Sequence, residues 1–233
     1  MTSEISGKIY LADQRGQLAT PHLRRYSTFS FGEYAHADRP PFGQLYGFNE
    51  ETLAGGHTLE LAVGQASHVL LLPITGALEV TPAAGPSTTI EAEEVQVLTL
   101  PAGTVLQLTN PYEADLVSFL HIWLLAEEVV AHVEQRVFPF DMRAATNHLP
   151  ALVPFTASPV EAFCLSLGRF AGRGEAVYQL QRPGTRFFAY VLAGAFEAEG
   201  RLLHEGDGLA LWQTTAIELE ALSNNALLLI LEF

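Results

Sequence analysis

Residues 55–76, GGHTLELAVGQASHVLLLPITG, decide how this chain is expected to fold. A glycine stands at each end and apolar runs lie between them, which is typical of β-strands entered and left through turns. The two histidines, His57 and His68, are too far apart in the sequence to form a local chelate. The stretch therefore predicts strands and leaves open whether they hold a metal ion.

Short runs of the same kind recur along the chain. They include VQVLTLPAGTVLQLT, DLVSFLHIWLL, FFAYVLAGAFEAEG and ALLLILEF, with Gly, Pro, Asn or Thr as punctuation. Regularly spaced short strands predict an all-β sandwich or barrel. Helical periodicity is weak, and its best candidate is residues 125–137, LAEEVVAHVEQRV, as a turn or two of helix between domains.

A repeated pattern sets the expected number of domains. Residues 74–80, ITGALEV, are echoed by residues 192–198, LAGAFEA, and in each copy a glycine turn joins two strands before an acidic turn leads to a third. Such an echo predicts an internal duplication. We expect two β-barrels in tandem, residues 1–137 and 138–233, with the boundary in the proline-rich, pattern-poor residues 138–159.

The composition limits the partners of the chain. Its 233 residues are 48% hydrophobic and 16% charged, enough to bury a sizeable core. With 26 acidic against 12 basic residues and a formal charge of −14, the surface should repel phosphate backbones and anionic lipid. Nucleic acid is therefore not an expected partner, and the one basic pair, Arg24 and Arg25, is expected to form local ion pairs.

The only cysteine and the start of the chain indicate the cellular setting. Cys164 cannot form an intramolecular disulfide, and its neighbours alternate like a half-buried strand, so we expect a buried structural thiol. The first residues, MTSEISGKIYLADQRG, lack a positive region followed by an apolar one, and no segment approaches the length needed to span a bilayer. We expect a cytoplasmic protein that does not enter a membrane.

Both ends of the chain resemble a known family. Residues 15–56 resemble the opening of pirin and the pirin-like bacterial quercetinases, where a Thr-Phe-Ser-Phe segment precedes a loop and an Asn-acidic turn; here these are TFSF and NEE. Residues 204–233, HEGDGLALWQTTAIELEALSNNALLLILEF, resemble the C-terminal strands of the shorter bacterial members. The likeness covers nearly the whole chain and implies an all-β bicupin, two jelly-roll barrels with little helix.

The resemblance also implies where a metal would be held. In the family, a His-x-His pair on one strand and a His and a Glu on a later strand bind Fe(II) or a similar first-row metal, because alternate strand residues share a face. Counted from Gly56, the pair falls at Ala62 and Gly64, and the later ligands fall at Leu108 and Asn110. None carries an imidazole or a carboxylate. The resemblance therefore implies a divergent member without the family's metal ligands, and no cofactor is expected.

Three histidines remain as candidates for a relocated site. His68 has the strand parity of Ala62 and Gly64 and is expected to point into the barrel. His121 should face the cavity and His57 should lie at the strand entrance. One hypothesis is a three-histidine metal centre or a general base; the other is that each is an isolated core or rim histidine, hydrogen-bonded to a carbonyl or water. The remaining histidines are expected on the surface: His22, His36, His132, His148 and His204.

Other catalytic patterns are weak or absent in the sequence. It contains no Gly-x-Ser-x-Gly elbow and no Walker-type glycine loop. Glu50 and Glu51 are adjacent, and adjacent strand residues point to opposite faces, so a solvated turn is expected rather than an acid–base pair. Tyr34 or Tyr46, near a barrel mouth, could stack on a flat ligand.

The leading hypothesis is a pirin-like bicupin that binds or regulates rather than catalyses. Its cavity would take a small apolar or aromatic molecule, or the protein would contact a protein partner. The alternative is an enzyme, either a quercetinase-type dioxygenase with a relocated histidine site or a metal-independent isomerase using His68 as a base. The residues expected at the cavity are His57, Ala62, Gly64, His68, Leu108 and His121.

Overall fold

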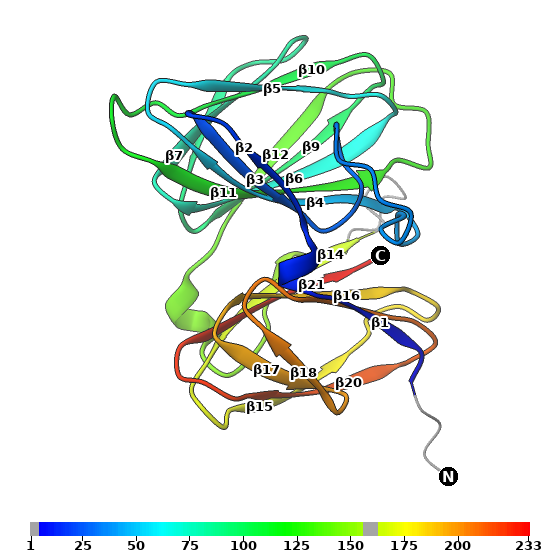
Figure 1. Ribbon diagram of the computed structural model, residues 1–233. Helices are drawn as coiled ribbons and strands as arrows, with labels where there is room; N and C mark the ends of the chain where they lie inside the picture. The colour runs from blue at the N-terminus through cyan, green and yellow to red at the C-terminus, as the bar shows by residue number, and fades with distance from the viewer. Residues whose placement is uncertain (1–4, 156–162) are drawn as a thin grey trace. The chain divides into compact units, whose positions relative to one another are not determined.

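The protein is described by a computed structural model that covers residues 5–155 and 163–233. Twenty-one strands and two short 3-10 helices make up the regular structure of these residues. Two compact units divide the chain, each in its described part (Figure 1). The N-terminal unit is Arg15–Phe140, and the C-terminal unit combines Asp141–Phe233 with Met1–Gln14.

The N-terminal unit consists of two antiparallel sheets that face each other. A seven-stranded sheet has the order β12-β9-β6-β11-β4-β3-β2, and a four-stranded sheet has the order β5-β10-β7-β8. The strands are β2 (Gly16–Ala19), β3 (Leu23–Ser27), β4 (Leu45–Leu53), β5 (Thr58–Ala62), β6 (Ser67–Thr75), β7 (Ala77–Pro82), β8 (Thr88–Glu91), β9 (Glu94–Leu100), β10 (Val105–Thr109), β11 (Val117–Leu125) and β12 (Glu134–Pro139).

The C-terminal unit repeats this plan with fewer strands. A six-stranded sheet has the order β1-β19-β16-β21-β14-β13, and a four-stranded sheet has the order β15-β20-β17-β18. The elements are β1 (Gly7–Tyr10), η1 (Ala12–Gln14), η2 (Met142–Ala145), β13 (Ala151–Val153), β14 (Cys164–Phe170), β15 (Glu175–Gln179), β16 (Phe187–Ala193), β17 (Ala195–Ala198), β18 (Arg201–His204), β19 (Gly208–Leu211), β20 (Ala216–Ala221) and β21 (Ala226–Glu232).

The strand orders agree with an internal duplication. The order β9-β6-β11-β4 in one unit corresponds to β19-β16-β21-β14 in the other, and β5-β10-β7-β8 corresponds to β15-β20-β17-β18. The two echoed segments form equivalent hairpins, with Gly76 at φ +73° and Gly194 at φ +78° in the turns. A left-handed φ is costly for other residues, which explains the glycine in both copies. The all-β bicupin fold is confirmed, although the sheets do not close into barrels.

The helix expected at residues 125–137 is wrong. Strand β11 runs to Leu125 and β12 begins at Glu134, with no helix between them. Val129 is 97% exposed. A helix here would have had no neighbouring apolar surface on which to bury such a residue, and short helices need that burial.

Residues 1–137 were expected to form the first barrel, but the start of the chain pairs with a strand of the C-terminal unit. Strand β1 pairs with β19 of the C-terminal unit, from Gly7 opposite Leu211 to Tyr10 opposite Gly208. The backbone N–H of Ala12 then donates to Asp207 Oδ1 at 2.7 Å. The domain boundary was expected within residues 138–159. Strand β12 continues into this range as far as Pro139, and residues 156–159 lie outside the described residues.

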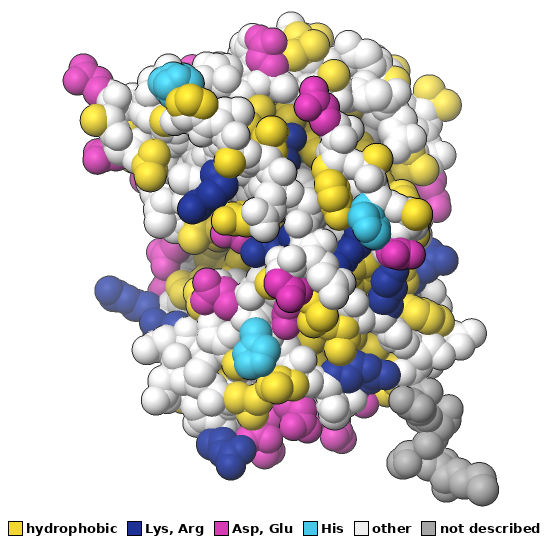
Figure 2. Space-filling model, viewed as in Figure 1, with side chains coloured by type: hydrophobic (Ala, Val, Ile, Leu, Met, Phe, Trp, Pro, Cys, Tyr) yellow, Lys and Arg dark blue, Asp and Glu magenta, His cyan; other side chains and the backbone are white. Residues whose placement is uncertain are grey.

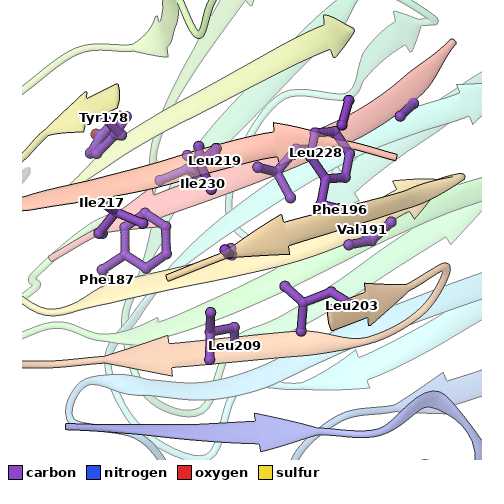
Figure 3. Packing of buried hydrophobic residues seen from close by; sticks show 14 of the residues in the cluster. Tyr178, Phe187, Val191, Phe196, Leu203, Leu209, Ile217, Leu219, Leu228 and Ile230 are labelled. Carbon is purple, nitrogen blue, oxygen red and sulfur yellow. The ribbon is translucent and has the colours of Figure 1, made fainter. Parts of the chain in front are cut away.

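Each unit has its own hydrophobic core. In the C-terminal unit the core forms between the two sheets, and Figure 3 shows part of it, including Phe187, Phe196 and Ile230. Cys164 is buried and free, as expected. In the N-terminal unit Leu71 and Phe119 belong to the core cluster. Within the described residues, no helix has the length and apolar character needed to cross a bilayer.

Candidate functional site: a pocket in the N-terminal unit

A cavity of about 570 Å³ opens between the two sheets of the N-terminal unit. Its walls come from β2, β3, β4 and β11 of the large sheet and from β5 of the small one. Strand β2 ends one sheet and β5 ends the other, so the two sheets share no hydrogen-bonded seam here. The open edge of the sandwich therefore forms the entrance.

The lining is mainly apolar and aromatic, with one buried cation. Leucines come from both sheets, and Phe31, Tyr46 and Trp123 contribute aromatic rings. The ring centroids of Phe31 and Trp123 are 5.6 Å apart, and those of Tyr46 and Trp123 are 6.1 Å apart. Arg25 from β3 is also part of the wall. Of the two tyrosines considered from the sequence, Tyr46 lines this pocket; Tyr34 is not among the lining residues.

Ala62 and Gly64, the positions aligned with the family's His-x-His pair, line this same pocket. Ala62 is the last residue of β5. Both residues are exposed, and a Cβ added to Gly64 would meet no other atom within 4 Å, so the two positions lie at the open mouth of the pocket. The positions at which the sequence resemblance placed the His-x-His pair therefore border a pocket and carry no imidazole.

The two later positions lie in the interior. Leu108 faces the hydrophobic core, fully buried, and is not among the lining residues. Asn110 is fully buried and holds a turn: its Nδ2 donates to the carbonyls of Leu53 and Asp115, and its Oδ1 accepts from the Tyr112 N–H. Its hydrogen-bonding groups are therefore used within the protein.

His68 does not enter the sandwich, so the sequence prediction of its direction is wrong. Val69 and Leu71 of the same strand face the core, which places His68 on the opposite face of β6. Its Nδ1 is 3.0 Å from Thr99 Oγ1 on β9. The prediction carried strand parity from Ala62 to His68 and assumed that Ala62 faces the interior. Leu61 and Val63 belong to the core cluster and Ala62 is exposed, so the shared parity of Ala62 and His68 places both residues away from the core.

His57 also lies apart from the pocket lining. Its ring stacks on His22 at 3.8 Å between centroids, and its Nδ1 is 2.7 Å from the Gly55 carbonyl oxygen. A ring fixed in this way matches the rim histidine of the second hypothesis. The five histidines expected on the surface are all exposed, which confirms that prediction: His22, His36, His132, His148 and His204.

His121 is the one candidate that faces the interior as expected. It is fully buried on β11, on the same face as Phe119 and Trp123. Trp123 Nε1 donates to His121 Nδ1 at 2.6 Å, so the imidazole proton is on Nε2, which donates to Glu51 Oε1 at 2.7 Å. Burial lowers the pKa of His121 below 6.5, although Glu51 acts in the opposite direction. His121 is therefore neutral at physiological pH.

Glu51 is the functional candidate that sequence reasoning missed. It was expected in a solvated turn but is fully buried within β4, where its Oε1 accepts from His121 and from Arg25 Nε. One signal was available: Glu51 has the strand parity of Leu45 and Leu53, both buried. Its two partners lie on neighbouring strands, β3 and β11, and no local pattern links them.

Several buried polar atoms beside this pair have no hydrogen-bond partner among the described residues. They include Arg25 Nη2, Glu51 Oε2, and both Oδ1 and Nδ2 of the fully buried Asn49. Asn49 lies opposite His121 in the β4–β11 register. Buried polar atoms without protein partners are rare and commonly bind water or a ligand. A chain of polar groups thus leads inward from Arg25 in the pocket wall.

The residues of this pocket do not fit the metal centre implied by the family resemblance. Ala62 and Gly64 offer no side-chain lone pair, and both nitrogens of His121 are used in hydrogen bonds. Across the described residues, no three His, Cys, Asp or Glu side chains are grouped so as to hold a metal ion. The chemistry of this site therefore has to be derived from Arg25, Glu51, His121 and the aromatic walls.

A second hollow, also about 570 Å³, lies on the small sheet of the C-terminal unit and has the opposite character. Five glutamates line it, from β15, β20 and the β17–β18 hairpin, and Figure 2 shows acidic side chains gathered along the lower edge. Glu220 lies between Glu175 and Glu197 in the strand register. Such a surface repels anions.

Comparison with known proteins agrees with the fold and with the sequence resemblance. The crystal structure of YhhW from Escherichia coli matches with a TM-score of 0.84 at 20% identity, over 98% of this chain and 97% of that one. Residues 162–232 match the family model described as the quercetinase C-terminal cupin domain. A Pasteurella multocida protein, provisionally named quercetin 2,3-dioxygenase, is 26% identical over 95% of this chain and 97% of its own length.

These comparisons support a pirin-like quercetinase family for the chain. The quercetin 2,3-dioxygenase of Escherichia coli is 24% identical to this pirin-like chain, again over 95% of the chain and 97% of the relative. A structure of the bacterial pirin YhhW in complex with nickel(II) matches with a TM-score of 0.83 at 20% identity, over 98% of this chain and 99% of that one. This pirin-like chain shares that fold, with Ala62 and Gly64 at the pocket.

Proposed function

We propose that this pirin-like protein binds a flat aromatic small molecule in the pocket of its N-terminal unit, without a metal ion. The observation that carries the proposal is the hollow at Ala62 and Gly64, which is bordered by aromatic rings and leucines. Its volume of about 570 Å³ is within the range of small-molecule sites, which are commonly apolar with a few fixed polar groups.

The aromatic walls favour a planar ligand over an aliphatic one. Phe31 and Tyr46 are tilted by 50° and 56° against Trp123, so the three rings form an aromatic corner. Trp123 uses its only N–H on His121, and the Tyr46 hydroxyl is 2.6 Å from Ser67 Oγ. With these polar atoms already used, the indole and phenol rings are left to make apolar and stacking contacts.

Quercetin 2,3-dioxygenase activity is the second candidate function. It is favoured by the names of two relatives that align over 95% of the chain. It would have to proceed without the ligand set of the family resemblance, because Ala62, Gly64, Leu108 and Asn110 carry no imidazole or carboxylate. Oxygen consumption with quercetin, measured after adding iron, nickel, manganese or zinc, tests this candidate directly.

The binding proposal is tested by calorimetric titration with 2-naphthamide, a neutral flat aromatic probe, in buffer containing EDTA. We expect saturable binding near one equivalent. Gly64→Phe should weaken it, because Gly64 is an exposed lining residue at the mouth of the pocket and a benzyl group there would narrow the entrance. Val129→Phe, at a site in the same unit that is 97% exposed, is the matched control and should bind normally. Absence of binding by the unmodified protein would refute the proposal.

A further inference from the structure

The pocket contains one buried cation whose donors are mostly unused. Arg25 is 8% exposed and belongs to the wall. Its guanidinium makes a single hydrogen bond to the described residues, from Nε to Glu51, and Nη2 has no partner there. Nη1 is 3.6 Å from the position that a Cβ on Gly32, another lining residue, would take. Neither Nη1 nor Nη2 therefore bonds to the described residues, and because Nη2 is enclosed, Nη1 is the donor that a ligand in the pocket meets first.

Glu51, the carboxylate bonded to Arg25, lies on the side of the guanidinium that faces away from the pocket. Glu51 is fully buried and is not among the lining residues. Its Oε1 accepts from both Arg25 and His121, so that oxygen is shared between two donors. A group entering from the pocket meets the guanidinium before it meets the carboxylate. Glu60 also lines the pocket, but it is exposed and its Oε1 accepts from Gln107. Because Coulomb energy falls with distance and is screened at exposed groups, an anion in contact with Arg25 is attracted more than it is repelled.

The guanidinium is also held in place before any ligand arrives. Phe31 packs against it, with 5.4 Å between the guanidinium carbon and the ring centroid. Glu51 fixes its Nε side and is in turn bonded to His121, which holds Trp123. One continuous chain of hydrogen bonds thus positions the cation and one aromatic wall together. A preorganised donor binds an oxygen with a smaller loss of entropy than a mobile one does.

From these contacts we propose that the ligand is an aromatic acid, a flat ring system whose carboxylate or phenolate oxygen is bound by Arg25. This inference rests on the proposed function, and it adds the charge and the anchoring residue. Arginine suits the role because its planar donors match the geometry of an anionic oxygen pair. The aromatic corner contacts the ring, and Arg25 fixes its orientation.

An isosteric pair of probes separates this inference from the proposed function. We would titrate the protein with 2-naphthoate and 2-naphthamide at pH 8 in low-salt buffer with EDTA. The two share size and ring and differ in charge. We expect naphthoate to bind at least about tenfold more tightly, the range of one charge-assisted contact. Equal affinities would overturn the inference and leave the proposed function standing. Failure of both probes to bind would overturn the proposed function and the inference with it.

Substitutions then assign the preference to Arg25. Arg25→Gln combined with Glu51→Gln removes both buried charges together, which avoids leaving either one unpaired. It should abolish the preference for naphthoate and retain naphthamide binding. Arg24→Gln is the matched control: Arg24 is the exposed neighbour on the opposite face of β3 and bonds to Thr52. The double variant leaves the net charge of the protein unchanged, whereas Arg24→Gln lowers it by one. An equal loss of preference in both variants would overturn the assignment of the preference to Arg25.

Glu51→Gln alone should change the affinity for naphthoate in the opposite direction. If Arg25 anchors the anion, removing the competing carboxylate should tighten naphthoate binding and leave naphthamide unchanged. A purely structural ion pair would instead weaken both probes or neither. Should this variant fail to fold, the comparison of the two probes on the unmodified protein still decides the inference.

Discussion

Replacing His121 by leucine should lower the free energy of unfolding of the N-terminal unit by about 3–5 kcal/mol. Leucine cannot accept from Trp123 Nε1, which leaves a buried donor unpaired at a cost of about 1–3 kcal/mol. It also removes a donor from the fully buried Glu51, and a hydrogen bond to a charged group contributes about 1.5–3 kcal/mol. The two losses act on one connected chain of hydrogen bonds and are not expected to add in full.

Two further variants serve as controls for His121→Leu. His121→Gln keeps an acceptor for the indole and a donor for the carboxylate. It should therefore lower the free energy of unfolding by only about 1–2 kcal/mol, because the glutamine side chain fills the space of the imidazole imperfectly. His132→Leu removes a histidine of the same unit whose side chain is 77% exposed and 3.8 Å from Glu134. Exposed pairs of this kind contribute little, and we expect a change below about 0.5 kcal/mol.

The assay is urea unfolding followed by tryptophan fluorescence. The chain has two tryptophans, so a Trp212→Phe background makes Trp123 the only reporter and isolates the transition of its own unit. If leucine and glutamine at position 121 destabilise the unit equally, the hydrogen-bond chain is not what His121 contributes. A cost for leucine below about 1 kcal/mol would have the same meaning.

Three other predictions follow from buried groups. Because burial lowers the pKa of His121, the unfolded chain takes up its proton first; stability should fall below about pH 6.5, by at most about 1.4 kcal/mol per pH unit, and His121→Gln should flatten this slope in urea titrations. Asn110→Ala should cost about 2–4 kcal/mol in the same assay, because it leaves the buried Leu53 carbonyl, the part-buried Asp115 carbonyl and the Tyr112 N–H without their partner. Cys164 is buried with a raised pKa, so it should resist a thiol reagent at pH 8 and react fully in urea.

Local patterns were sufficient to predict the class of fold. Strand alternation and glycine turns depend on neighbouring residues, and Gly76 and Gly194, each between two apolar runs, mark the hairpin in both copies of the repeat. The resemblance at the two ends then implied the pirin-like family. The helix at residues 125–137 failed because periodicity alone does not show whether a partner surface exists.

The candidate site was predicted only in part, for a physical reason. Alternation predicts which residues of a strand share a face, and it located His121 correctly. It does not show which of the two faces is the inner one, and the assumption that Ala62 faces the interior placed His68 on the wrong face. Arg25 and Glu51 form a site only together with His121, and the three residues lie on three different strands. Contacts between distant segments of this kind leave no local pattern in the sequence.

The central claim is that the pocket of this pirin-like chain binds its ligand without a metal ion. Elemental analysis of the purified, untagged protein, after growth with iron, nickel, manganese and zinc supplied, tests the claim most directly. We predict far less than one equivalent of any first-row metal. Close to one equivalent that survives gel filtration and is lost in His121→Leu, while His132→Leu retains it, would contradict the account and place a metal at the very site where we derive none.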